Sequence, residues 1–105
     1  MRFINLTPHI INIYTADKEL ALSLPSDGIA RCATIKNEVG MVDGVPLFET
    51  TYGEVTGLPN FDPDAILIVS LLVRQAVPNR IDIFSPGELL RDESGQPIGC
   101  IGLSR

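Results

Sequence analysis

The chain contains few of the residues from which metal centres and disulfide scaffolds are built. In 105 residues it has one histidine, His9, and two cysteines, Cys32 and Cys100. A single histidine excludes a histidine-rich metal site. The cysteines lie far apart in sequence without Cys-x-x-Cys spacing, which favours two buried thiols over a disulfide or a zinc site. We therefore expect neither a metal nor another cofactor.

Long apolar runs and basic charge are also scarce. The most apolar stretch, residues 65–73, is much shorter than the roughly 20 residues that a membrane-spanning helix needs. Polar residues occur within the first five positions, so the N-terminus lacks the apolar core of a secretory signal. With 13 acidic and 8 basic residues, the formal charge of −5 repels phosphate backbones and anionic lipids. We expect a cytoplasmic protein that binds neither membranes nor nucleic acids in general.

The composition is typical of one globular domain. Hydrophobic residues make up 45% of the chain and charged residues 20%, which is too apolar for a disordered chain. A chain of 105 residues is also too short for two independent cores. We expect residues 1–105 to form a single domain.

Alternating apolar residues predict several strands in the first half of the chain. Residues 10–14 and 20–24 alternate in this way around a polar turn, which fits a hairpin. Pro25-Ser26-Asp27-Gly28 has the residue order of a type I turn, and an extended segment follows over residues 29–35. Asp43-Gly44 between two valines predicts a second hairpin, because a type I′ turn needs positive φ at both central residues.

The second half of the chain mixes strand and helix signals. Residues 65–69 are a continuous apolar run typical of a strand buried on both faces. Ser70 suits the N-cap of a short amphipathic helix that ends before Pro78, and residues 81–84 resume a strand. Residues 65–84 thus predict a compact βαβ unit with parallel strands. A last hairpin is expected with its turn over residues 92–95.

Together these patterns predict an α+β fold. It consists mostly of antiparallel β hairpins, with one short helix in a compact βαβ-like segment. An all-β barrel with a helical plug is the alternative. A domain with many strands and a modest core leaves strand edges exposed, and pairing between copies covers such edges. We therefore expect a homo-oligomer.

The carboxyl end of the βαβ-like segment is the preferred candidate for a ligand-binding site. Ligands bind at the carboxyl ends of parallel strands, and a helix N-terminus offers unpaired N–H groups to an anion. Ser70 at the start of the helix should meet Ser85 and Gly87 after the second strand. The cations nearest in sequence are Arg74, Arg80 and Arg91. The alternatives are a simple N-cap for Ser70 and solvated surface positions for the arginines.

His9 is the residue on which any catalytic interpretation depends. An imidazole titrates near neutral pH, and the corner Thr7-Pro8-His9 is able to aim it into a pocket, where it would be a ligand-binding residue. A small hydrolase acting through His9 is therefore the alternative function, and a hydrogen-bonded structural corner is the competing interpretation. No nucleophile, base and orienting group can be assembled from the other residues, so we assign no catalytic residue and favour a non-catalytic binding module.

Three segments carry a resemblance to known proteins: residues 5–9 (NLTPH), residues 52–59 (YGEVTGLP) and residues 86–100 (PGELLRDE, then Gly95 and IGC). In their order they resemble a family of small proteins of unassigned activity encoded by bacteriophages, prophages and some bacteria. The resemblance implies a phage setting, and hence the cytoplasm of a host cell, but supplies no catalytic residue. By analogy with other small phage proteins, it suggests sequestration of a nucleotide-like signal or inhibition of a host protein.

Overall fold

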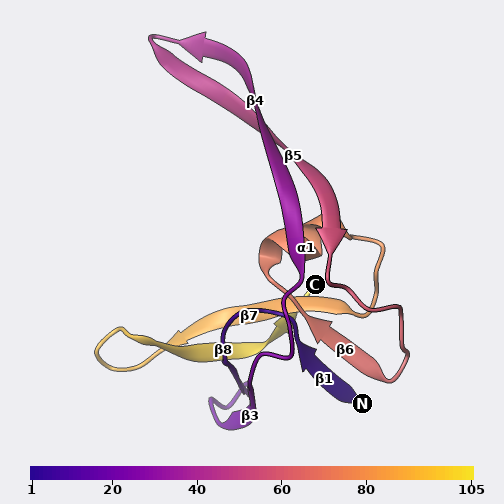
Figure 1. Cartoon of the computed structure of the whole chain (residues 1–105). Coiled ribbons are helices and arrows are strands. Elements are labelled where there is room, and N and C mark those ends of the chain that lie inside the picture. Colours follow the sequence, from indigo (N-terminus) through magenta and orange to yellow (C-terminus); the bar gives the residue numbers. More distant parts are fainter.

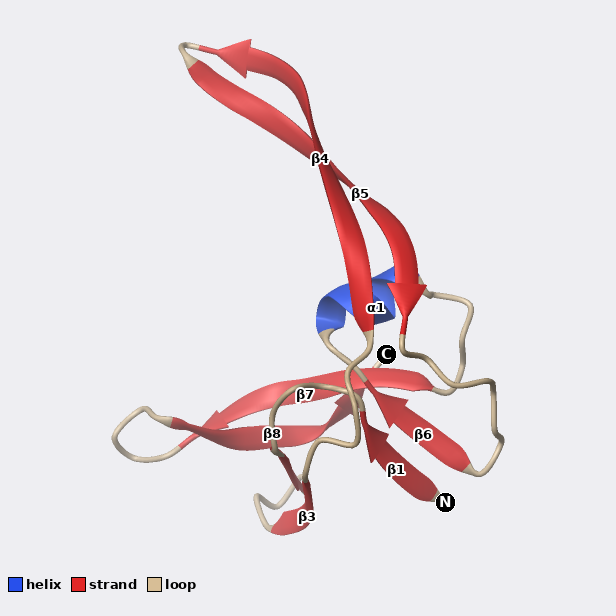
Figure 2. Ribbon diagram, viewed as in Figure 1, coloured by secondary structure: helices blue, strands red, loops and turns tan.

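The computed structural model describes residues 1–105, and most of the chain is extended (Figure 2). Eight strands and one helix follow in the order β1 (Arg2–Asn5), β2 (Ile11–Tyr14), β3 (Leu20–Leu24), β4 (Arg31–Val42), β5 (Val45–Thr56), β6 (Ala65–Ile68), α1 (Leu71–Ala76), β7 (Ile83–Arg91) and β8 (Pro97–Ser104). The expectation of a β-rich chain with one short helix is confirmed. The helix has six residues, and the chain forms no helix with the length and apolarity needed to cross a membrane.

Six strands form one mixed sheet that curves into a partly closed barrel, in the order β1-β6-β7-β8-β2-β3. The neighbours β1 and β6, β6 and β7, and β8 and β2 are parallel, whereas β7 and β8, and β2 and β3, are antiparallel. The predicted βαβ segment is present as β6-α1-β7, and β2–β3 and β7–β8 are two of the predicted hairpins. The expectation of a mostly antiparallel arrangement is wrong for this sheet, because it joins these pieces and three of its five pairings are parallel. An isolated hairpin is only marginally stable, and edge-to-edge pairing of the predicted pieces makes one larger sheet. Strand β1 was not predicted.

The buried side chain of Asn5 joins the two ends of this sheet. Its amide group donates to the carbonyls of His9 (2.7 Å) and Leu24 (2.9 Å). Its Oδ1 accepts from the main-chain N–H (3.0 Å) and the hydroxyl (2.6 Å) of Thr7. The Asn5 and Asp27 main chains are also paired, with Asp27 N–H donating to the Asn5 carbonyl at 2.8 Å. Since Asn5 ends β1 and Leu24 ends β3, these bonds bring the two edge strands together.

The hydrophobic core lies on both faces of β6. Leu67 and Val69 belong to a cluster that also contains Val73 of α1, whereas Ile68 between them belongs to a second cluster with Cys100. This alternation follows from the period of two in a strand. The prediction that residues 65–69 form a strand buried on both faces is confirmed, as is the burial of Cys100, whereas Cys32, also predicted to be buried, is only partly buried.

Strands β4 and β5 form a two-stranded antiparallel hairpin that projects away from the sheet (Figure 1). We call residues 31–56 the arm. At its tip, Asp43 and Gly44 have φ values of 51° and 80°, so the two residues predicted to form a type I′ turn both have the required positive φ. At its base the arm packs on α1, where the Tyr52 hydroxyl donates to Gln75 Oε1 at 3.3 Å.

Two local predictions are corrected by the structure. Residues 25–28 do not form the expected type I turn. Asp27 instead forms hydrogen bonds with the Asn5 main chain, and the segment continues without regular structure towards the arm. Strand β7 does not end at Phe84 but continues to Arg91, pairing with β8 along the way. Gly87 permits this, because a Cβ atom there would collide with carbonyl oxygens of β8.

Replacing Asn5 with alanine removes four side-chain hydrogen bonds and leaves buried partners unsatisfied. We expect Asn5→Ala to lower the free energy of unfolding by about 2–4 kcal/mol, measured by urea denaturation. Asn60, which is exposed and makes no side-chain hydrogen bond, provides the matched control: Asn60→Ala should change stability by less than about 0.5 kcal/mol. Equal effects of the two substitutions would show that Asn5 does not hold the sheet closed.

Candidate functional site

A groove of about 500 Å³ lies beside β7, β8 and the segment that enters β2. It is lined by residues 9–12 at the entrance to β2, residues 86, 87 and 89 of β7, and residues 97–100 of β8. Two other hollows, of about 120 and 400 Å³, lie near Asp62 and contain no histidine. The groove and the larger of these hollows both fall within the roughly 300–1,000 Å³ typical of a small-molecule site, and of the two the groove has His9 in its wall. We therefore treat it as the candidate site.

Beside the groove, β2 and β8 are paired over only a short distance. Their parallel ladder consists of the pairs Ile13–Cys100 and Tyr14–Ile101. Ahead of these pairs the strands are connected by the Asn12 side chain, whose amide donates to a β8 carbonyl at 3.3 Å and whose Oδ1 accepts from the Ser23 hydroxyl at 2.7 Å. Asn12 thus joins β2 to both of its neighbours, β8 and β3.

The walls of the groove are mostly apolar, with a few polar groups. Ile11 and Cys100 are buried at its base, whereas Ile10 and Leu89 are more than half exposed. The polar contributors are the His9 imidazole, the Asn12 amide and nearby peptide groups. Apolar walls with sparse polar groups suit a flat ring whose edges form hydrogen bonds. No cationic side chain lines the groove itself.

Three of the six residues predicted to bind a ligand lie in or next to this groove. His9 and Gly87 line it. Arg91 is the register partner of the lining residue Pro97, so its main chain lies directly beside one end of the groove. One guanidinium nitrogen of Arg91 donates to the Gly95 carbonyl at 2.8 Å and fixes the β7–β8 turn.

The other three lie outside the groove. The β6–β7 ladder ends at the pair Ile68–Phe84; Ser85 is the next residue within β7, and Ser70 lies two residues beyond the end of β6. The Ser70 hydroxyl accepts from the Val73 N–H at 3.4 Å, as the N-cap alternative predicts. The Ser85 hydroxyl is buried and donates to the Ser104 carbonyl at 3.5 Å. Arg74 is partly buried, and its Nε has no hydrogen-bond partner. Both hydroxyls are thus engaged within the chain.

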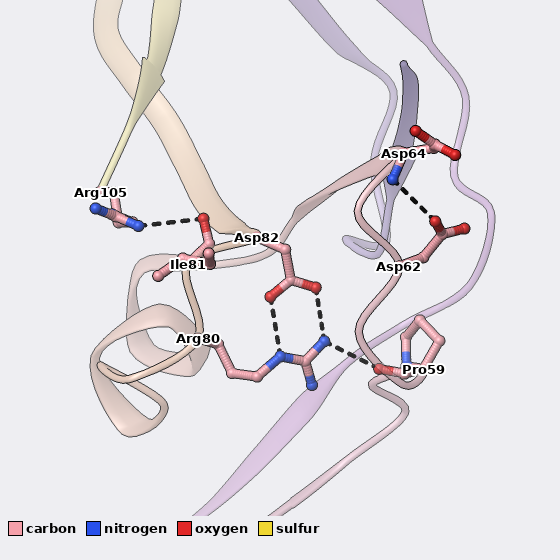
Figure 3. A network of polar contacts seen from close by, with 7 residues as sticks. All are labelled: Pro59, Asp62, Asp64, Arg80, Ile81, Asp82 and Arg105. Carbon is pink, nitrogen blue, oxygen red and sulfur yellow. Dashed lines mark hydrogen bonds and ion pairs between the residues drawn. The ribbon is translucent and has the colours of Figure 1, made fainter.

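Arg80, the remaining candidate cation, is held in an ion pair with Asp82 (Figure 3). Its Nε and Nη2 donate to the two carboxylate oxygens at 2.9 and 2.7 Å, and Nη2 also donates to the Pro59 carbonyl at 3.1 Å. These hydrogen bonds hold the pKa of Asp82 below its usual value and raise that of Arg80. The pair connects the loop before β6 to the chain entering β7, so the guanidinium is committed to a structural role.

Nine of the eleven groove residues were not identified by the sequence analysis, among them Asn12, Leu89 and Ile98. Each of these three belongs to a correctly anticipated strand, but their proximity depends on the parallel pairing of β2 with β8. One signal was available, because residues 5–9 and residues 86–100, two of the segments that carry the resemblance, both contribute to the groove. The third segment, residues 52–59, lies at the base of the arm and in the loop that follows.

No protein-family model, curated protein or solved structure matches the chain significantly. No three side chains of His, Cys, Asp or Glu lie close enough together to hold a metal ion.

The Arg80–Asp82 pair makes stability depend on pH in a defined direction. Asp82 has a lowered pKa in the folded chain, so its contribution is complete above its ordinary value of 3.8 and is lost as the pH falls through the lower folded value. We expect Asp82→Asn to reduce the free energy of unfolding at pH 7 by about 2 kcal/mol and to flatten its decline below about pH 4, measured by urea denaturation.

The exposed pair Arg2–Asp62, with an N–O distance of 2.8 Å, provides the control. Asp62→Asn should have a much smaller effect at pH 7, because solvent screens a pair whose partners are 68% and 42% exposed. If Asp82→Asn keeps the wild-type stability at pH 7, the pair does not anchor the loop.

Proposed function

We propose that the protein is a non-catalytic binding module that takes a nucleotide-like small molecule into the groove lined by β7, β8 and the segment entering β2. The observation that carries this proposal is the groove itself, with apolar walls, His9 at its edge and Arg91 beside one end. A base-like ring would lie between the segment entering β2 and the β7–β8 hairpin. Its polar edge would meet the His9 imidazole or the Asn12 amide.

Arg91 is the residue that would bind the charged part of such a ligand. A guanidinium has five N–H donors, and only one nitrogen of Arg91 is used by the Gly95 carbonyl. Its planar form suits bidentate contact with a phosphate. A short-range contact of this kind does not require a favourable net charge, so the acidic character of the chain is compatible with it.

The geometry favours binding over hydrolysis. A nucleophile and its base must lie within about 3 Å of each other. The hydrogen bonds of His9 use only its main-chain carbonyl, which accepts from Asn5 and Thr7, and its imidazole has no partner in the chain. The Cys100 thiol is buried and donates to the Gly102 carbonyl at 3.5 Å. Neither side chain is part of an activated pair.

The resemblance to phage proteins supports a role in sequestering a nucleotide signal in the host cytoplasm. Such a role needs a stable domain with a groove and no chemistry. Inhibition of a host protein would require an apolar contact surface, and the main surface of this kind, on the arm, is better explained by contact between copies of this chain.

Native mass spectrometry of protein purified gently from cells tests whether a small molecule is retained. We expect a retained mass of nucleotide size, and chemical-shift changes in the amides of residues 9–12 and 97–100 when a panel of mononucleotides and cyclic dinucleotides is added. Leu89→Trp should abolish both by filling the groove, without loss of stability because Leu89 is exposed. Arg91→Ala should weaken binding about 10- to 100-fold, the loss of a charge-assisted hydrogen bond.

The control is Leu20→Trp, an equally exposed position outside the groove, which should bind like the wild type. Absence of any retained mass and of shifts at the groove amides would contradict the proposal. Turnover of a panel nucleotide that disappears in His9→Ala would instead establish the hydrolase alternative.

A further inference from the structure

The arm exposes large apolar side chains to an unusual degree. It contains eight of the 17 exposed large hydrophobic residues, although it makes up about a quarter of the chain: Ile35, Val39, Met41, Val42, Val45, Leu47, Phe48 and Tyr52. The ten residues of its tip, 39–48, include a single charged side chain, Asp43. Scattered apolar residues on a surface are normal, but a contiguous group marks an interaction site.

These apolar side chains lie on both faces of the arm. Paired residues of an antiparallel ladder share a face, and the pairs Met41–Pro46 and Glu38–Phe48 place Met41 and Phe48 on one face. The pair Val42–Val45 and the neighbouring Leu47 belong to the opposite face. A flat contact with one side would leave the other exposed, so the arm needs to be covered from both sides.

The chain exposes more surface than a compact monomer of its mass, and the excess is large enough for a stable dimer interface. The chain exposes 7050 Å², whereas a compact monomer of 11.4 kDa exposes about 5,800 Å². The excess of roughly 1,300 Å² exceeds the roughly 800 Å² that each partner buries in a standard interface. The radius of gyration of 16.5 Å is likewise larger than the value of about 13 Å expected for a compact chain of this length.

We propose that the arm is a self-association surface, covered by the arm and body of a second copy of this chain. A two-stranded hairpin is only marginally stable alone, and its free edges invite uncontrolled pairing. The arm therefore needs a binding partner that is always present together with the chain. A second copy of the chain is such a partner. Around a two-fold axis each arm covers the other, so one contact protects both.

Sedimentation velocity and light scattering test this directly. We expect the wild type to have twice the mass of the chain at micromolar concentration. Phe48→Glu and Leu47→Glu, on opposite faces of the arm, should each weaken association at least about 100-fold, since both bury an unpaired charge in an apolar contact. Leu20→Glu is the matched control, because Leu20 is equally exposed but lies in β3 at the end of the body away from the arm (Figure 1).

Hydrogen exchange on the unmodified chain provides a second test that does not depend on a variant folding. Amides of residues 37–49 should be protected at high concentration and lose that protection on dilution, whereas those of β6 should stay protected. A wild type that is monomeric at about 100 μM, or Phe48→Glu and Leu47→Glu variants that keep the wild-type mass, would overturn the proposal. A monomer that dimerises only when a nucleotide is added would also overturn it, because the arm is proposed to associate without a ligand.

Discussion

Asn5 closes the sheet, and the positions of the groove and of the arm follow from that closure. Strands β1 and β3 would otherwise be free edges of a six-stranded sheet, and Asn5 supplies the bonds between them. The next residue continues the connection, since Leu6 donates to the Ile68 carbonyl at 2.8 Å and accepts from Ala30 at 3.0 Å. Because a buried amide is costly when unpaired, the complete set of partners specifies one arrangement of the chain here.

The same bonds create both candidate surfaces. By holding the His9 carbonyl, Asn5 and Thr7 fix the direction in which the chain enters β2 and leave the imidazole at the edge of the groove. By holding Ala30, the Leu6 carbonyl fixes the point where the arm begins. Ala30 is part of the core cluster on the α1 side of the sheet, so the arm is anchored at its base although its tip has no intramolecular partner.

Local patterns in the sequence predicted most strands and the helix, but they did not predict which strands pair in the sheet. Asp43-Gly44, the apolar run at residues 65–69 and the Ser70 cap depend on neighbours in sequence, and each was found where expected. The pairings of β1 with β6 and of β2 with β8 join residues about 60 and 90 positions apart, which no local pattern encodes. For the same reason His9 and Gly87 were identified as candidates, but the groove that they share was not.

The net negative charge of the arm opposes the proposed association, so the repulsion between two arms has to be compared with the free energy of burying their apolar side chains. The arm carries Arg31 and Lys36 against Glu38, Asp43, Glu49 and Glu54, so two arms repel each other. Two like charges 4 Å apart in water cost about 1 kcal/mol, and salt screens those beyond about 8–10 Å. Burying roughly 1,000 Å² of apolar surface contributes about 25 kcal/mol before the entropy of association is subtracted. The repulsion is therefore too small to prevent association, but it disfavours registers that place the acidic side chains of the two arms against each other, which restricts how the arms can pair.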